Sequence, residues 1–227
     1  MSENEIILDA SEHRSDQSIP EMDENKLLQT IWLQPNNTLL YIVYRQPNKM
    51  VTLLLILGGA VSGLNNAMDG ESFFDQSAYL KLGVALIAGS IFGAVGNMIL
   101  AAILAWCGRL IGGKGRYHHV LPAVAWSLVP VIAQIIPICL TLGYFGFDAA
   151  IGYIDLSATS SQIIFYGLLF LEFCLTVWSL VIMVTGLSVA HRFSIGKAIL
   201  NLLIPVLIIL VPLGIIAFVM GDLFSNF

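Results

Sequence analysis

Five long apolar runs occupy most of the chain after residue 49. They cover residues 50–68, 82–107, 120–147, 163–190 and 199–220. Because about 20 apolar residues span the hydrocarbon core of a bilayer, each run is long enough to cross it as a helix. The pattern predicts an all-α membrane protein, a five-helix transmembrane bundle over residues 50–221.

The residues before the first run divide into two parts. Residues 1–26 are polar, acidic and without periodicity, which predicts a disordered cytoplasmic tail. Residues 27–49 carry apolar side chains at helical spacing, interrupted by Pro35. This segment is too short and too polar to span, so it predicts short N-terminal interfacial helices. Packing against the protein's own cytoplasmic loops is the alternative.

Composition supports a membrane protein and excludes several other classes. Hydrophobic residues make up 57% of the chain, charged residues 11%, and the mean hydropathy is +0.85. Soluble domains have about 25% charged residues. Most of the excess negative charge lies in residues 1–26, and no basic surface remains for nucleic acid. The three cysteines have no paired spacing, so neither a disulfide framework nor a metal site is expected.

The distribution of Lys and Arg predicts the orientation. With a cytoplasmic N-terminus, nine of the ten basic residues fall inside and only Lys81 falls outside. The positive-inside rule therefore places the N-terminus in the cytoplasm and the short C-terminus, residues 222–227, on the other side.

Small residues and prolines predict how the spans pack. Gly89 and Gly93 form a GxxxG pair, which lets two helix backbones approach closely. The partner helix belongs either to the same chain or, in a homo-oligomer, to a second copy. Pro122, Pro130 and Pro137 each remove a backbone donor, so the third span is expected to be kinked.

Glu172 is the one acidic residue well inside a span. An ionised side chain there costs on the order of 3 kcal/mol, so it is expected to face the bundle interior. Gln134 and Ser90 are expected at similar depth, with Asn97 deeper toward the cytoplasm. Such a cluster fits either a proton or cation pathway, or a neutral glutamic acid that fixes helix register through one hydrogen bond.

The loop at residues 108–119 combines four glycines with Arg109, Lys114 and Arg116. Backbone amides exposed by glycine, together with three cations, would suit a phosphate or an anionic lipid headgroup. The alternative is an ordinary positive anchor on a flexible loop. The loop lacks the GxxxxGK[ST] pattern of a nucleotide-binding loop.

Two stretches carry a resemblance to a known family. They are IWLQPNNTLLYIVYRQP at residues 31–47 and WCGRLIGGKGRYHHVLPAVAWSLVP at residues 106–130. With five spans and an acidic cytoplasmic tail, the chain resembles the Yip domain family, its bacterial branch in particular. The resemblance implies a small multi-span protein of the inner membrane without known catalysis. The Asp-Leu-x-Gly-Pro type motif of eukaryotic members is missing, so their association with Rab-type GTPases is not implied.

The motifs of membrane-embedded enzymes are missing from the sequence, and no catalytic residue or cofactor is expected. The leading hypothesis is a non-enzymatic membrane scaffold or adaptor that contacts a cytoplasmic protein or anionic lipid. The alternative is a small channel, transporter or lipid-moving protein that uses Glu172.

Overall fold

The computed structural model describes residues 19–69, 77–151, 154–208 and 210. The regular secondary structure in these residues is helical. The helices are η1 (Glu24–Lys26), α2 (Leu27–Leu33), α3 (Pro35–Arg45), α4 (Val51–Asp69), α5 (Ala78–Leu110), α6 (Tyr117–Ser127), α7 (Val129–Ala133), α8 (Ile135–Phe145), η2 (Phe147–Ile151), α9 (Thr159–His191) and a last helix at Ile195–Ile208.

Four segments are long and apolar enough to cross a membrane, which confirms a multi-span helical membrane protein. They are Val51–Met68, Ala78–Leu110, Tyr117–Phe145 and Thr159–His191. The Ile195–Ile208 helix is apolar but shorter. The rest of the predicted fifth span, and the C-terminal residues 222–227, lie outside the described residues.

Helices α5 and α9 are longer than the apolar runs that predict them. Each has 33 residues, a length of about 50 Å against the ~30 Å of the hydrocarbon core. The predicted runs at 82–107 and 163–190 stop where polar side chains begin. Helix α5 continues through Lys81 and Arg109, and α9 continues through residues 159–162 and His191, because these polar side chains leave the backbone donors and acceptors in place.

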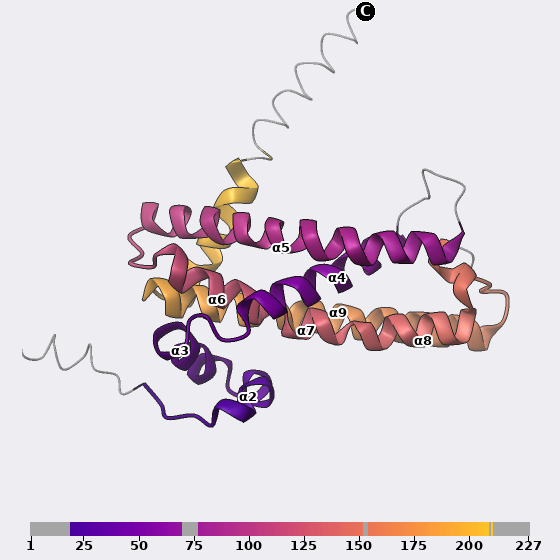
Figure 1. The fold of residues 1–227 in the computed structure, drawn as a ribbon, viewed down its shortest axis with the longest axis horizontal. Coiled ribbons are helices and arrows are strands. Elements are labelled where there is room, and N and C mark those ends of the chain that lie inside the picture. Colours follow the sequence, from indigo (N-terminus) through magenta and orange to yellow (C-terminus); the bar gives the residue numbers. More distant parts are fainter. Residues whose placement is uncertain (1–18, 70–76, 152–153, 209, 211–227) are drawn as a thin grey trace, which may run out of the picture.

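The third span is a broken helix. Helices α6, α7 and α8 follow one another along the bundle in Figure 1, with interruptions at Leu128 and Gln134. Pro130 and Pro137 fall in the first turns of α7 and α8, where a missing N–H costs least. The predicted kinks are therefore confirmed at these two prolines, whereas α6 continues through Pro122.

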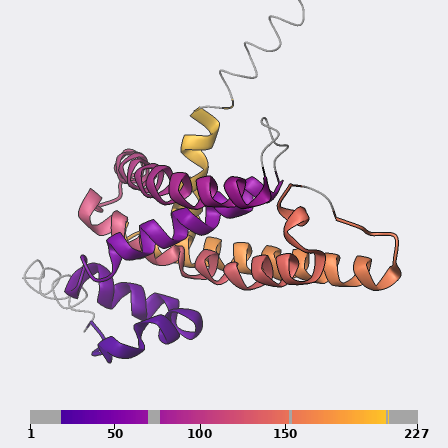
Figure 2. The ribbon, with the colours of Figure 1, turned by 45° about the vertical axis from the view of Figure 1, so that its right-hand side comes forward.

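The long helices run side by side along the bundle. Figure 1 shows α5 along its whole length, with α6, α7 and α8 roughly parallel to it, and the turned view of Figure 2 shows α2 and α3 grouped at one end. Helix α4 packs along α5, and α9 packs against α6, α7 and α8.

The end of the bundle at the left of Figure 1 is named the basic end here. Helix α5 ends there, α6 begins there, and α9 ends there. Tyr44 of α3 donates a hydrogen bond to the Val189 carbonyl of α9 (3.0 Å), and the backbone amide of Lys114 donates to the His191 carbonyl (3.0 Å). The exposed bases of this end are Arg45, Arg109, Lys114, Arg116, Arg192 and Lys197.

The N-terminal helices α2 and α3 are built into the hydrophobic core of the basic end. Ile31, Leu39 and Ile42 have no exposed surface and pack in one cluster with Trp126 of α6 and Ile182 of α9. The apolar face that suggested an interfacial segment is thus covered by protein, as in the packing alternative. A position at the membrane surface stays a prediction.

Part of the tail that was expected to be disordered lies in the described residues and is folded there. Residues 1–18 lie outside the described residues, but Glu24–Lys26 form the helical turn η1. Asp23 caps this turn by accepting a hydrogen bond from the Asn25 amide (3.0 Å). The low hydrophobicity of the tail hid this turn, because its stability comes from a cap and from the Glu24 contacts described below.

Candidate functional site

The glycine-rich loop between α5 and α6 wraps around one buried histidine. His191, the last residue of α9, is only 1% exposed. A Cβ atom on Gly108 would lie 2.1 Å from its Cε1 atom, and one on Gly113 would lie 2.5 Å from its Nδ1 atom. A Cβ on Gly115 would lie 2.8 Å from Nδ1. These three glycines are required because the imidazole fills the space that side chains would take.

The loop amides are also used within the protein. The Gly113 amide donates to the Gly108 carbonyl (2.8 Å), and the Gly115 amide donates to Nδ1 of His191 (3.2 Å). With the Lys114 amide bound to the His191 carbonyl, these donors are not available to an anion. What remains exposed for a headgroup is the cationic side chains of Arg109, Lys114 and Arg116.

His191 was not singled out in the sequence. It lies 76 residues from Gly115, and a lone histidine at the end of a span gives no local signal. The sequence did single out the glycines, but it predicted that they expose backbone amides to an anion or keep the loop flexible, and not that they make room for a buried side chain. A long-range contact decides their role, and sequence spacing does not show it.

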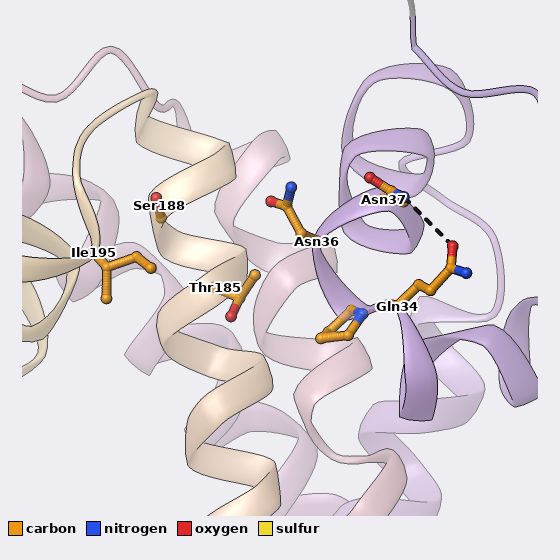
Figure 3. Close-up of a pocket in the computed structure, with 7 residues that line it drawn as sticks. Gln34, Asn36, Asn37, Thr185, Ser188 and Ile195 are labelled. Atoms are coloured by element: carbon orange, nitrogen blue, oxygen red, sulfur yellow. Dashed lines mark hydrogen bonds between the residues drawn. The ribbon is translucent and has the colours of Figure 1, made fainter.

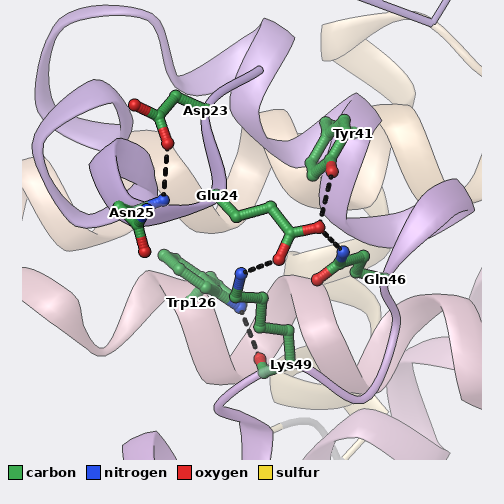
Figure 4. Close-up of polar contacts among 7 residues, drawn as sticks. All are labelled: Asp23, Glu24, Asn25, Tyr41, Gln46, Lys49 and Trp126. Atoms are coloured by element: carbon green, nitrogen blue, oxygen red, sulfur yellow. Dashed lines mark hydrogen bonds and ion pairs between the residues drawn. The ribbon is translucent and has the colours of Figure 1, made fainter. Parts of the chain in front are cut away.

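Glu24 fastens the N-terminal helices to the bundle (Figure 4). Its carboxylate accepts hydrogen bonds from Tyr41 (3.4 Å), from Gln46 and from Lys49 (2.6 Å). Lys49, chiefly through its hydrogen bond and also through its charge, holds the pKa of Glu24 below its ordinary value of 4.5. The Lys49 carbonyl in turn accepts from Nε1 of Trp126 (3.2 Å). The contacts of Glu24 with Tyr41, Gln46 and Lys49 are called the Glu24 latch. Through Lys49 they connect η1 to Trp126 of α6 in the third span.

A second contact joins α3 to the end of α9. Arg192 donates a hydrogen bond from Nε to the Tyr44 hydroxyl (3.1 Å), and its guanidinium lies 5.0 Å from the centre of the Tyr44 ring. Cation–π contacts of this kind contribute about 0.5–1 kcal/mol at exposed sites. Together with the Glu24 latch, this contact fixes the position of α3 on the bundle.

A pocket of about 430 Å³ lies beside this contact, between α3 and α9 (Figure 3). Gln34, Asn36 and Asn37 line one side, and Thr185 and Ser188 line the other. These side chains are polar but uncharged, and they offer both donors and acceptors. The pocket was not predicted, since it joins segments about 150 residues apart.

Gln134 holds three helices together inside the bundle. It lies at the break between α7 and α8 and is 5% exposed. Its Oε1 atom accepts from Nδ2 of Asn65 in α4 (2.8 Å), and its Nε2 atom donates to Oγ1 of Thr176 (2.8 Å) and to the Glu172 carbonyl (3.3 Å) in α9. Gln134 thus meets Glu172 through the backbone of Glu172, and its amide is committed to joining helices.

The remaining polar candidates are not brought together. The Glu172 side chain is half-buried and lines a groove with Asn65, Gln134 and Thr176. Ser90 donates to the Leu86 carbonyl (2.7 Å) and Asn97 to the Gly93 carbonyl (2.8 Å), both within α5. The expected Glu–Gln–Ser cluster does not include Ser90, since neither Ser90 nor Asn97 lines that groove.

Gly89 and Gly93 lie against α4 of the same chain. A Cβ atom on Gly93 would lie 2.5 Å from the Cα atom of Gly59, and one on Gly89 would lie 2.7 Å from the Cα atom of Gly63. A second small-residue pair, Gly59 and Gly63, therefore meets the first. Of the two alternatives, the structure shows the intramolecular one, and a homo-oligomer stays a prediction.

Nothing in the described residues indicates a metal centre, because no three His, Cys, Asp or Glu side chains are grouped so that they could hold an ion. Cys107 is buried, and Cys139 and Cys174 are exposed on their helices.

Comparisons with known proteins agree with the architecture. Neither the curated proteins nor the solved structures contain a match to the chain. The family model described as the Yip1 domain matches residues 29–216. This match begins within α2 and covers the four spans found in the described residues and the glycine loop. The chain therefore belongs to the Yip1 domain family, and it is a multi-pass membrane protein of that family.

Proposed function

We propose that the protein is a non-enzymatic scaffold that displays the basic end of its bundle on the cytoplasmic face of a bacterial inner membrane. In this proposal the spans anchor the protein, and the end formed by α2, α3 and the glycine loop contacts a cytoplasmic protein. Membership of a family that is in general non-enzymatic supports the first part.

The observation that carries the proposal is an apolar layer within the core of the basic end, on the side toward the Gln134 bridge. In α4 the layer holds Leu54 and Leu55, in α6 Trp126, and in α9 Ile182, and none of these is more than 4% exposed. The serine hydroxyls at this level bond to backbone carbonyls: Ser179 donates to the Ser127 carbonyl (2.7 Å), and Ser127 donates to the Val124 carbonyl (2.7 Å). A channel or transporter built on Glu172 would need a continuous polar path through this layer, because a charge is costly in an apolar medium. A scaffold does not need one.

The rigidity of the basic end supports a binding role. The Glu24 latch, the Tyr44–Arg192 contact and the His191 loop hold the ends of four helices in fixed positions. The pocket at Gln34, Asn36 and Asn37 opens on this end, with Leu33 84% exposed beside it. An exposed leucine beside donors and acceptors suits a polypeptide partner.

The orientation follows from the same end. The exposed bases of the basic end lie together, whereas Lys81 lies near the start of α5 at the opposite end. Since cytoplasmic loops carry the excess of Lys and Arg, this distribution supports the proposed cytoplasmic position of the basic end.

The first test measures transport. The purified protein and a Glu172→Gln variant are reconstituted in vesicles, and proton flux, potassium flux and phospholipid translocation are followed. The scaffold proposal predicts that vesicles with either protein show the same flux and translocation rates as protein-free vesicles. A flux or translocation that Glu172→Gln lowers would contradict it and support the channel or lipid-moving alternative.

The second test measures contact with a partner in cells. A photoreactive amino acid is placed at Asn36 beside the pocket, and at Tyr79, which is 68% exposed at the opposite end. The proposal predicts one discrete protein adduct from position 36 and none from position 79. Equal labelling from both positions would remove the basic end as the binding surface. Truncation is a poor substitute beyond residue 18, because Leu27 and Ile31 belong to the core.

A further inference from the structure

The half of the bundle away from the basic end has a groove with a polar floor. The groove has a volume of about 550 Å³, within the ~300–1,000 Å³ usual for ligand sites. Asn65, Gln134, Glu172 and Thr176 form its polar part. Gln134 lines the floor of the groove and is held in place by its hydrogen bonds to Asn65 and Thr176. Glu172 adds a carboxyl group to the same lining.

The walls of the groove are apolar and face away from the protein. Tyr166 is 59% exposed, Phe170 67% and Phe173 62%. They lie on α9, a helix long and apolar enough to span the membrane. Exposed aromatic rings on a spanning helix meet lipid chains, so a ligand enters this groove from the bilayer.

The depth of Glu172 limits the kind of headgroup that can reach it. Helix α9 exceeds the hydrocarbon core by about 20 Å in total, and Glu172 lies thirteen residues, or about 20 Å, from its start at Thr159. With the excess shared between the two ends, Glu172 lies about 10 Å inside the hydrocarbon boundary. A charged headgroup is costly at that depth, whereas a neutral hydroxyl group that gains a hydrogen bond there is not.

We propose that this groove binds a neutral long-chain lipid with a hydroxyl head, whose hydroxyl group enters past Tyr166 and Phe170 and pairs with the Glu172 carboxyl while its chain runs past Phe173 and Thr176 toward the bilayer centre. The carboxyl group accepts a hydrogen bond from the hydroxyl group when it is ionised and donates one to the hydroxyl oxygen when it is neutral, so the pair forms in either state. The site opens to lipid and lies on the far side of the apolar layer, so it does not depend on the scaffold proposal.

The test uses hexadecanol that carries a diazirine at mid-chain, added to the full-length protein in phosphatidylcholine nanodiscs. After irradiation, labelled positions are identified by peptide mass spectrometry. The variants are Glu172→Leu and, as a matched control, Ser90→Ala, which removes a polar group from another span outside the groove. Thermal unfolding checks that both variants are folded.

The proposal predicts adducts concentrated on residues 173–181, which follow Glu172 toward the bilayer centre and include the exposed Phe173, Val177 and Leu180. Glu172→Leu should lower them about fivefold, the loss of one hydrogen bond, and Ser90→Ala should leave them unchanged. Unlabelled hexadecanol should compete, whereas hexadecane and hexadecyl phosphate should not. Adducts spread evenly over α5 and α9, or equal competition by hexadecane, would overturn the proposal. If Glu172→Leu does not fold, the competition series on the unchanged protein decides alone.

Discussion

The two halves of α9 are both mainly apolar but have different surroundings. From Thr159 to Val181 none of its residues is buried, whereas Ile182, Leu187 and His191 in the second half are at most 1% exposed. The second half packs among α2, α3, α6 and the glycine loop, and the first half packs on α7 and α8. Hydropathy alone does not distinguish them. The difference shows that, among the described residues, the bundle is closely packed at its basic end, whereas the α9 side chains at the other end are not covered.

The largest expected difference in stability between the two halves of α9 comes from truncating one side chain in each of them. Leu187→Ala opens a cavity at a fully buried site and should cost about 2–5 kcal/mol. Phe170→Ala removes a ring that is 67% exposed and should change stability by at most about 0.5 kcal/mol. Thermal unfolding of the purified proteins measures both. Equal losses would show that the two halves are packed alike.

The glycine loop sharpens the comparison with a smaller effect. Gly108→Ala places a methyl group against the His191 ring, and overpacking of this kind costs about 1–3 kcal/mol. Gly96→Ala, in the same helix, meets nothing within 4 Å and is the control. The cost of Gly108→Ala should fall in a His191→Ala background, as a double-mutant cycle would show. An unchanged cost would remove His191 as the reason for the glycine.

The Gln134 bridge lies between the two halves and should contribute less. Gln134→Leu leaves Asn65 and Thr176 without their partner, and hydrogen bonds between spans average about 0.6 kcal/mol each, so a loss of about 1 kcal/mol is expected. Asn97→Leu loses only a bond within its own helix and is the control. A loss for Asn97→Leu as large as that for Gln134→Leu would contradict the bridging role.

The smallest expected effect is at the exposed Glu24 latch, and it depends on pH. Because the pKa of Glu24 is lowered in the folded protein, the latch adds stability above the ordinary pKa of 4.5 and loses it as pH falls through the lowered value. Glu24→Gln should therefore lower the Tm slightly at pH 7. The difference in Tm between this variant and the protein with Glu24 should disappear below pH 4.5. Glu21→Gln, at a nearby exposed residue, is the control. A difference that persists in acid would mean that the carboxylate charge is not responsible.

The sequence predicted the elements of this fold better than their contacts. Apolar runs identify spans because lipid imposes their length, and Pro130 and Pro137 mark breaks because proline lacks a donor. The partner of Gly89 and Gly93 was not predicted, since Gly59 and Gly63 gave no distinguishing signal. The apolar face of α3 left two alternatives, because amphipathicity does not show whether protein or lipid covers the face.

The candidate site was predicted in part for the same reason. Glu172 and Gln134 were singled out by depth, and the structure places them in adjacent helices. Ser90 was grouped with them by depth alone, but depth does not determine the direction of a side chain around a helix. His191 and the pocket at Asn36 each depend on contacts between distant segments, which no local pattern encodes.

The most direct test of the account is the accessibility of the apolar layer to water. In a background with Cys107, Cys139 and Cys174 replaced by alanine, Ile182→Cys and Lys114→Cys are reconstituted in vesicles and treated with a membrane-impermeant thiol reagent from the basic end. Lys114→Cys, in the exposed loop, should react rapidly, and Ile182→Cys should stay unmodified. Modification of Ile182→Cys at a rate close to that of Lys114→Cys would show a water-filled path through the layer. That result would contradict the scaffold account.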